Sequence, residues 1–198
     1  MAVFLKTNEC EEAVFALEVV AEWLERAERD IGYWKWVILA LHNAVQGFMV
    51  LALRGSNGLC PLKDDIAKKW LSAYESGKPY PTEKLDTFLN LYKKVKSKEM
   101  MCFYIYSKEV IPSSTLDHNI KKLNSLRNKF VHFVPIFWEL EVSDLPEISL
   151  DCLILVEFLA LECGNIVFYK EEYIERCKKA IATIKIILTR AIEASRPA

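Results

Sequence analysis

The chain is organised around residues 33–53, which read YWKWVILALHNAVQGFMVLAL. Apolar residues cover nearly the whole circumference of a helix built from this stretch, which is typical of a helix buried on all sides. Arg54 and Gly55 follow it, in the usual order of a cation and then a glycine at a helix end. Its length also suits a membrane span, but Lys35 and His42 would be expensive in lipid. We therefore expect the central helix of a soluble bundle.

Apolar residues recur at helical spacing in six other segments. Polar caps at Asn8 and Thr82 mark the expected starts of two of them. The expected helices cover residues 8–30, 64–74, 82–95, 148–168 and 171–195, and another starts near residue 114 or 115 and is limited by Pro135. Residues 96–106 fit either a continued helix or a short extended piece, and residues 138–146 fit a connector.

These patterns predict an all-α fold, an antiparallel bundle of about six or seven helices. We expect a single domain over residues 1–198, in which the helix over residues 8–30 is either part of the bundle or an added element.

Composition limits the classes of function. A hydrophobic fraction of 52% over 198 residues supports a compact core and argues against disorder. The formal net charge of −1 gives no overall basic field, so nucleic-acid binding would need a local patch. The six cysteines form no C-x-x-C pair and suit a reduced, cytoplasmic protein. Because no cysteine or histidine cluster has the spacing of metal ligands, and no glycine-rich phosphate loop is present, we expect neither a metal nor a cofactor.

Residues 123–133, which read LNSLRNKFVHF, carry the strongest chemical signal. Arg127 is followed directly by Asn128, and His132 lies five positions after the arginine. The planar guanidinium of arginine matches phosphate oxygens, and histidine exchanges protons near neutral pH. A phosphate clamp beside a proton-transfer group is what phosphodiester cleavage needs in the absence of a metal.

This stretch resembles the R-polar-x-x-x-H signature of HEPN domains, small helical bundles of which many are RNA-cutting toxins or defence effectors. The resemblance is close over residues 123–133 and loose from Gly32 to the C-terminus. It implies a metal-independent endoribonuclease that leaves 2′,3′-cyclic phosphate ends. His132 would act as general acid or base, Arg127 would stabilise the phosphoryl oxygens, and Asn128 would orient the histidine or hold substrate. Some HEPN-like domains are instead binding or scaffold modules, which is the alternative function.

The family resemblance also implies partners. Many members are homodimers in which each motif completes the other, and some are toxins controlled by an antitoxin or belong to defence systems. In one subgroup a tyrosine two residues after the histidine is modified by the antitoxin. Val134 stands at that position here, so this mode of control is not expected.

The helical spacing leaves the shape of the site open. Five residues turn an ideal helix by about 140°, so Arg127 and His132 would not share a face, whereas Asn128 and His132 would. Either the two groups flank one groove, or the helix ends inside the motif and His132 is redirected. A purely structural alternative pairs Arg127 with Glu139 or Glu162 and uses His132 to cap a helix end.

Two further groups of residues are weaker candidates for substrate binding. His42, Asn43 and Gln46 lie close together on the central helix, where they either satisfy buried hydrogen bonds or line the same cleft as His132. Lys121, Lys122 and Lys129 surround the motif and would supply local phosphate contacts, although solvated helix faces often carry such lysines.

Overall fold

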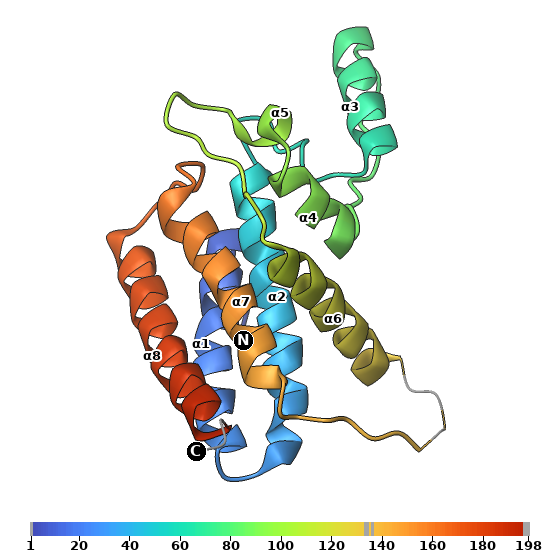
Figure 1. The fold of residues 1–198 in the computed structure, drawn as a ribbon. Helices are drawn as coiled ribbons and strands as arrows, with labels where there is room; N and C mark the ends of the chain where they lie inside the picture. Colours follow the sequence, from blue (N-terminus) through green and yellow to red (C-terminus); the bar gives the residue numbers. More distant parts are fainter. Residues whose placement is uncertain (1, 133–134, 136, 196–198) are drawn as a thin grey trace.

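The computed structural model describes residues 2–132, 135 and 137–195, and these residues form an all-helical bundle without β-strands (Figure 1). The predicted fold class is therefore confirmed. The helices are α1 (Glu9–Ala27), α2 (Trp34–Leu53), α3 (Asp64–Ser76), α4 (Phe88–Val95), α5 (Lys98–Met101), α6 (Ser114–Val131), α7 (Leu145–Glu157) and α8 (Glu171–Ser195). A 3₁₀ turn, η1 (Ile31–Tyr33), precedes α2, and a π-helical turn, η2 (Phe158–Glu162), ends α7.

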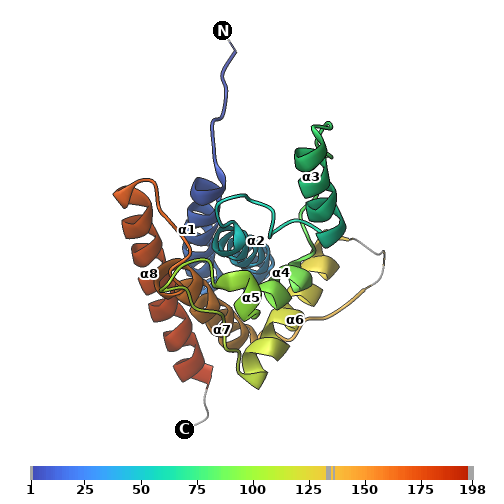
Figure 2. The ribbon, with the colours of Figure 1, turned by 90° about the horizontal axis from the view of Figure 1, so that it is seen from above.

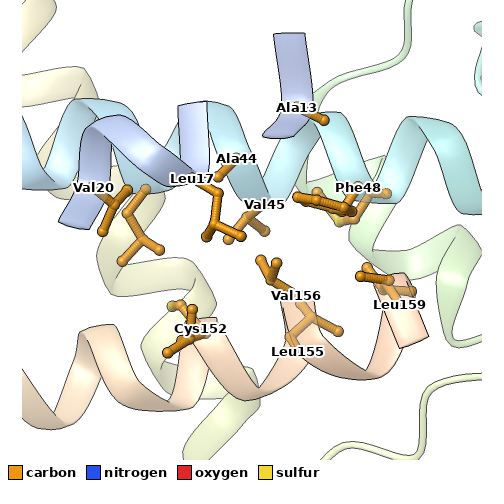
Figure 3. Close-up of a cluster of buried hydrophobic side chains, with 14 of the residues drawn as sticks. Ala13, Leu17, Val20, Ala44, Val45, Phe48, Cys152, Leu155, Val156 and Leu159 are labelled. Atoms are coloured by element: carbon orange, nitrogen blue, oxygen red, sulfur yellow. The ribbon is translucent and has the colours of Figure 1, made fainter. Parts of the chain in front are cut away.

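Helix α2 is the buried centre of the bundle, as its sequence predicts. Leu17 on α1, Phe48 on α2 and Val156 on α7 meet in one continuous core (Figure 3). Among the described residues, Ile31–Leu53 is the one segment that is long and apolar enough to cross a membrane by length and composition. Within this segment, 67% of the most apolar stretch of 18 residues is buried. That degree of burial is compatible with the core helix of a soluble protein.

Helix α1 belongs to the same core and is not a separate layer. Its apolar stripe, which includes Val14, Leu17 and Leu24, is fully buried within the main cluster. The predicted cap at Asn8 is confirmed, because its side chain accepts hydrogen bonds from the backbone N–H groups of Cys10 and Glu11. The end of this helix at Ala27 falls three residues short of the prediction.

Three further predicted boundaries, which belong to two helices, are wrong. The cap is Thr87 and not Thr82, because the Thr87 hydroxyl accepts the Asn90 N–H. The helix predicted over residues 148–168 begins at Leu145 and ends at Glu162. Gly164 then turns the chain with φ +77°, at a point where a Cβ atom would lie 3.0 Å from the Tyr106 carbonyl oxygen.

Helix α3 projects away from the bundle (Figure 1). It is rooted in a small apolar cluster of its own, formed by Leu59, Leu62 and Ile66. Beneath that cluster the buried Lys94 ammonium donates to the Leu62 carbonyl at 2.6 Å and pairs with Asp86 at 3.0 Å. This hydrogen-bonded lysine attaches the α3 segment to α4.

Asn165, which is buried in the loop after η2, closes the end of the bundle at which α2 ends, the upper end in Figure 1. Its amide donates to the carbonyl oxygens of Ala52 at 3.0 Å and Met101 at 2.8 Å, and its side-chain oxygen accepts the Ser107 hydroxyl. One side chain thus joins the end of α2, the end of α5 and the loop before α6.

Candidate functional site

Helix α6 positions the motif at its C-terminal end. The helix starts at the Ser113 cap and buries Ile120, Leu123 and Leu126 against the bundle. It ends at Val131, and the His132 N–H still donates to the Asn128 carbonyl at 2.9 Å.

His132 itself has left the helix. Its backbone angles are φ −97° and ψ 87°, and its residue is exposed to solvent. The helix therefore ends inside the motif, which is the second of the two arrangements that the spacing allows. His132 also occupies the C-cap position, as the structural alternative expects.

Arg127 is half-buried and has no acidic partner among the described residues, so the ion pairs considered with Glu139 and Glu162 are not formed. Its Nη1 atom donates to the Asn128 side-chain oxygen at 3.0 Å. That bond ties the guanidinium to the next residue without neutralising its charge. A fixed, uncompensated guanidinium is suited to binding an anion.

A second histidine reaches the motif helix from α2. His42 is 2% exposed, stacks on Phe88 with ring centroids 4.0 Å apart, and its Nε2 atom hydrogen-bonds with the Asn124 side-chain oxygen at 3.2 Å. Asn124 lies one helical turn before Asn128. His42 therefore supports the helix that carries the motif.

The environment of His42 keeps it neutral. Burial lowers the pKa of His42 to about 4, the hydrogen bond to Asn124 opposes this change, and the nearby charge of Arg127 adds to it. With Nε2 donating to Asn124, the Nδ1 atom remains a buried acceptor that has no partner in the described structure. A neutral ring places no second positive charge beside Arg127.

The structure separates His42 from Asn43 and Gln46. The latter two side chains line a groove between α2 and α1, away from the α6 contact made by His42. Asn124, by contrast, was missed by the sequence interpretation. It lies four residues before Asn128 and eight before His132, but this spacing alone did not distinguish it from other polar residues of the helix.

Lys121, Lys122 and Lys129 are exposed on α6, in keeping with a solvated basic surface around the motif. The Lys129 ammonium lies 5.7 Å from the centre of the Trp138 ring. The same ring packs on Phe130 with centroids 5.1 Å apart, so an aromatic side chain from the connector covers the end of α6. Trp138 is 37% exposed, and part of its surface therefore remains open.

Comparison with family models, curated proteins and solved structures finds no match to this chain. The HEPN resemblance therefore rests on residues 123–133 and on the helical pattern alone.

The chemistry of this site suits anions better than cations. Among residues 2–132, 135 and 137–195, no three histidine, cysteine or acidic side chains are grouped so as to hold a metal ion. The motif offers a guanidinium, surrounding ammonium groups and one exposed imidazole. These are groups that bind a phosphate and move a proton.

Proposed function

We propose that this protein is a metal-independent endoribonuclease of the toxin or defence type that cuts RNA at the C-terminal end of α6. The observation that supports the proposal is that one short segment at the end of α6 carries both the half-buried Arg127, which has no carboxylate partner among the described residues, and the exposed His132. A cytoplasmic location is part of the same proposal, and the burial of most of α2 in the bundle is compatible with a soluble protein.

The proposed reaction is an internal transfer at phosphorus. The 2′-oxygen attacks the adjacent phosphate and forms a new P–O bond as the bond to the 5′-oxygen breaks. A base removes the 2′-hydroxyl proton, and an acid gives a proton to the departing 5′-oxygen. Arg127 stabilises the charge that gathers on the phosphoryl oxygens, while Asn128 holds the guanidinium in place. The products are a 2′,3′-cyclic phosphate and a 5′-hydroxyl.

Two proton transfers favour a site shared by two copies of the chain. One motif supplies a single exposed imidazole, and His42 is too deeply buried to reach a substrate. A homodimer would place two histidines in one cleft, one as base and the other as acid. In this shared site, each Arg127 would face the same phosphate from opposite sides.

The decisive experiment compares two exposed histidines, one just after the end of α6 and one within it. His132→Ala should abolish cleavage of a mixed RNA pool, whereas His118→Ala, an exposed change on α6 outside the motif, should leave it intact. Chelator should have no effect on the wild type, and product ends should carry cyclic phosphate. Cleavage by His132→Ala at the wild-type rate, or its loss in chelator, would refute the proposal.

A second candidate function is a HEPN-like binding or scaffold module. It is favoured by α3, whose exposed Leu71 and Tyr74 project from the bundle beside the stacked pair of Trp70 and Tyr80. Apolar side chains on a projecting helix suit a protein partner, such as an antitoxin or another defence component. Tight RNA binding or partner binding without any cleavage would favour this function over the first.

A further inference from the structure

The first residues of the chain carry apolar side chains that are mostly exposed to solvent. Val3, Phe4 and Leu5 are 97%, 79% and 90% exposed. They belong to an extended segment, residues 2–7, which we call the arm and which projects away from the body beside α1 and α2 (Figure 2). Three adjacent large apolar residues in water are a costly arrangement unless another surface covers them.

An open groove lies between the outer faces of α1 and α2. Its volume is about 490 Å³. Its apolar lining comes from Phe15, Ala16 and Val19 on α1 and from Ala40, Gly47 and Val50 on α2. The groove is bounded by tight helix packing, because a Cβ atom on Gly47 would lie 2.9 Å from the Ala13 Cβ. Small residues thus leave an apolar depression that no described helix fills.

The arm and the groove match in length and charge. Six extended residues span about 20 Å, and the α1 side of the groove, from Glu9 to Val19, spans about 15 Å. Lys6 follows the three apolar residues of the arm, while Glu9, which also pairs with Arg54, and Glu12 line the groove. An arm lying in the groove would bury its apolar residues and bring its lysine near these carboxylates.

The base of the arm directs it outward. Asn8 caps α1 with an extended backbone, φ −143° and ψ 168°, and the Thr7 hydroxyl donates to Glu12 at 2.7 Å. An arm that turned back along its own α1 would have to reverse direction directly beside these contacts. A second copy facing the α1–α2 surface meets the arm without any such change.

We propose that the arm of one copy binds in the α1–α2 groove of a second copy, and that the two copies exchange arms across this face. The interface is independent of the proposed ribonuclease site, because His42 and the motif helix lie on a different side of α2 from the groove. Phe4 and Leu5 fill the groove, and Lys6 lies beside its acidic residues.

Sedimentation of the full chain tests the exchange. Deletion of residues 2–6, which keeps Thr7 and the Asn8 cap, should halve the mass of the assembly at micromolar concentration. Phe4→Asp should weaken self-association by about a hundredfold or more, since a charge replaces a buried ring in both copies. Ile105→Asp makes the same kind of change at a residue that is 94% exposed on a distant loop, and it should leave the mass unchanged.

Mixing two defective chains distinguishes exchange between copies from an arm that folds onto its own groove. Ala16→Arg blocks the groove with a long cation and keeps the arm, while the deleted chain keeps the groove and lacks the arm. Each variant alone should show the reduced mass, and an equimolar mixture should recover part of the larger assembly.

Two outcomes would overturn the proposal. One is an unchanged mass after the deletion and after Phe4→Asp. The other is a mixture that shows no recovery although circular dichroism shows that both chains are folded. RNA cleavage is measured on the same arm-deleted chain. Failure of the arm-exchange proposal can then be told apart from failure of the proposed ribonuclease activity.

Discussion

Arg127 acts through the shape of its side chain as well as through its charge in the proposed mechanism. Arg127→Lys keeps the charge but removes the planar pair of donors. We expect turnover to fall by about a hundredfold or more, comparable to removal of one transition-state donor. RNA affinity at fixed salt should change much less, because attraction to phosphate survives the substitution.

The measurement is the single-turnover cleavage rate together with RNA affinity on the same preparation. Arg29→Lys makes the same exchange at an exposed position on the turn after α1 and serves as the control. Equal rates for wild type and Arg127→Lys would show that guanidinium geometry is unimportant. If Arg127→Lys loses stability to the same degree as activity, the role of Arg127 is structural.

His42 should make the fold sensitive to acid. Its pKa is about 4 in the folded chain and near 6.5 in an unfolded one, so the unfolded state takes up a proton first as the pH falls. Stability is therefore unaffected by this group above pH 6.5 and declines progressively between about pH 6.5 and 4. At pH 5 the loss attributable to His42 is roughly 2 kcal/mol.

His42→Gln removes the titration and retains a donor for Asn124. Urea unfolding at pH 7.5 and 5.0 should show a smaller acid-induced loss of stability for this variant than for wild type. His118→Gln, at an exposed site, should behave as wild type. If His42→Gln and wild type lose the same free energy on acidification, the ring is not held neutral by the fold.

At the residue scale, residue types and spacing were enough to single out Arg127, Asn128 and His132. They were not enough to find Asn124, since an asparagine on a helix surface carries no special signal until a buried partner is known. That partner, His42, comes from a segment 82 residues away. Local patterns do not specify which helix faces meet across such a separation.

Among the elements, α3 is attached through a buried lysine as well as through apolar packing. Burial opposes the charge of Lys94, but the hydrogen bonds to Asp64 and Asp86 outweigh this effect and raise the pKa of Lys94. Lys94→Met would leave the nearly buried Asp86 carboxylate without its cation. We expect a loss of about 3–5 kcal/mol, the usual cost of removing one partner of a buried ion pair.

The loss should be greatest in the segment that Lys94 anchors. Amide exchange over residues 59–86 should accelerate, and proteolysis at the exposed Tyr74 and Tyr80 should increase. Lys93→Met, one position earlier and exposed, is the matched control and should change neither. Unchanged exchange over this segment in Lys94→Met would show that the Leu59 cluster alone holds α3.

The helices with an uninterrupted apolar stripe were predicted well, and α8 matches its predicted bounds of 171–195. Boundaries failed where two signals competed. Thr82 and Thr87 are both acceptable caps, but the Lys63 N–H donates to the Lys84 carbonyl and the Asp86 N–H donates to the Pro61 carbonyl. These bonds hold residues 84–86 outside the helix, so the later threonine is used. After Glu162 the apolar run continues to Phe168, but Asn165 and Gly164 require a turn there. The expected effect of Pro135 on Val134 lies outside the described residues.

For the whole molecule, the two proposed interfaces have a joint consequence. The shared site would use the end of α6, whereas arm exchange would use the α1–α2 face. A chain with two different self-complementary faces assembles past the dimer, most simply into a tetramer with two-fold axes.

We therefore expect wild type to sediment as a tetramer and the arm-deleted chain as a dimer that still cleaves RNA. Analytical ultracentrifugation and a cleavage assay on the same samples provide the measurement. An arm-deleted monomer with full activity would eliminate the shared site, because each chain would then hold a complete one.

The Asn165 amide has a consequence for the order in which the chain folds. It joins carbonyl groups that are 113 and 64 residues away, so its hydrogen bonds can form only after most of the chain is already in place. Asn165→Ala should therefore speed unfolding and leave the refolding rate nearly unchanged, as stopped-flow kinetics in urea would record. A slower refolding rate would instead place this contact in the folding nucleus. If closure is late, we expect the end of the bundle that Asn165 closes to open before the rest of the core under native conditions, which amide exchange of residues 101–107 would show.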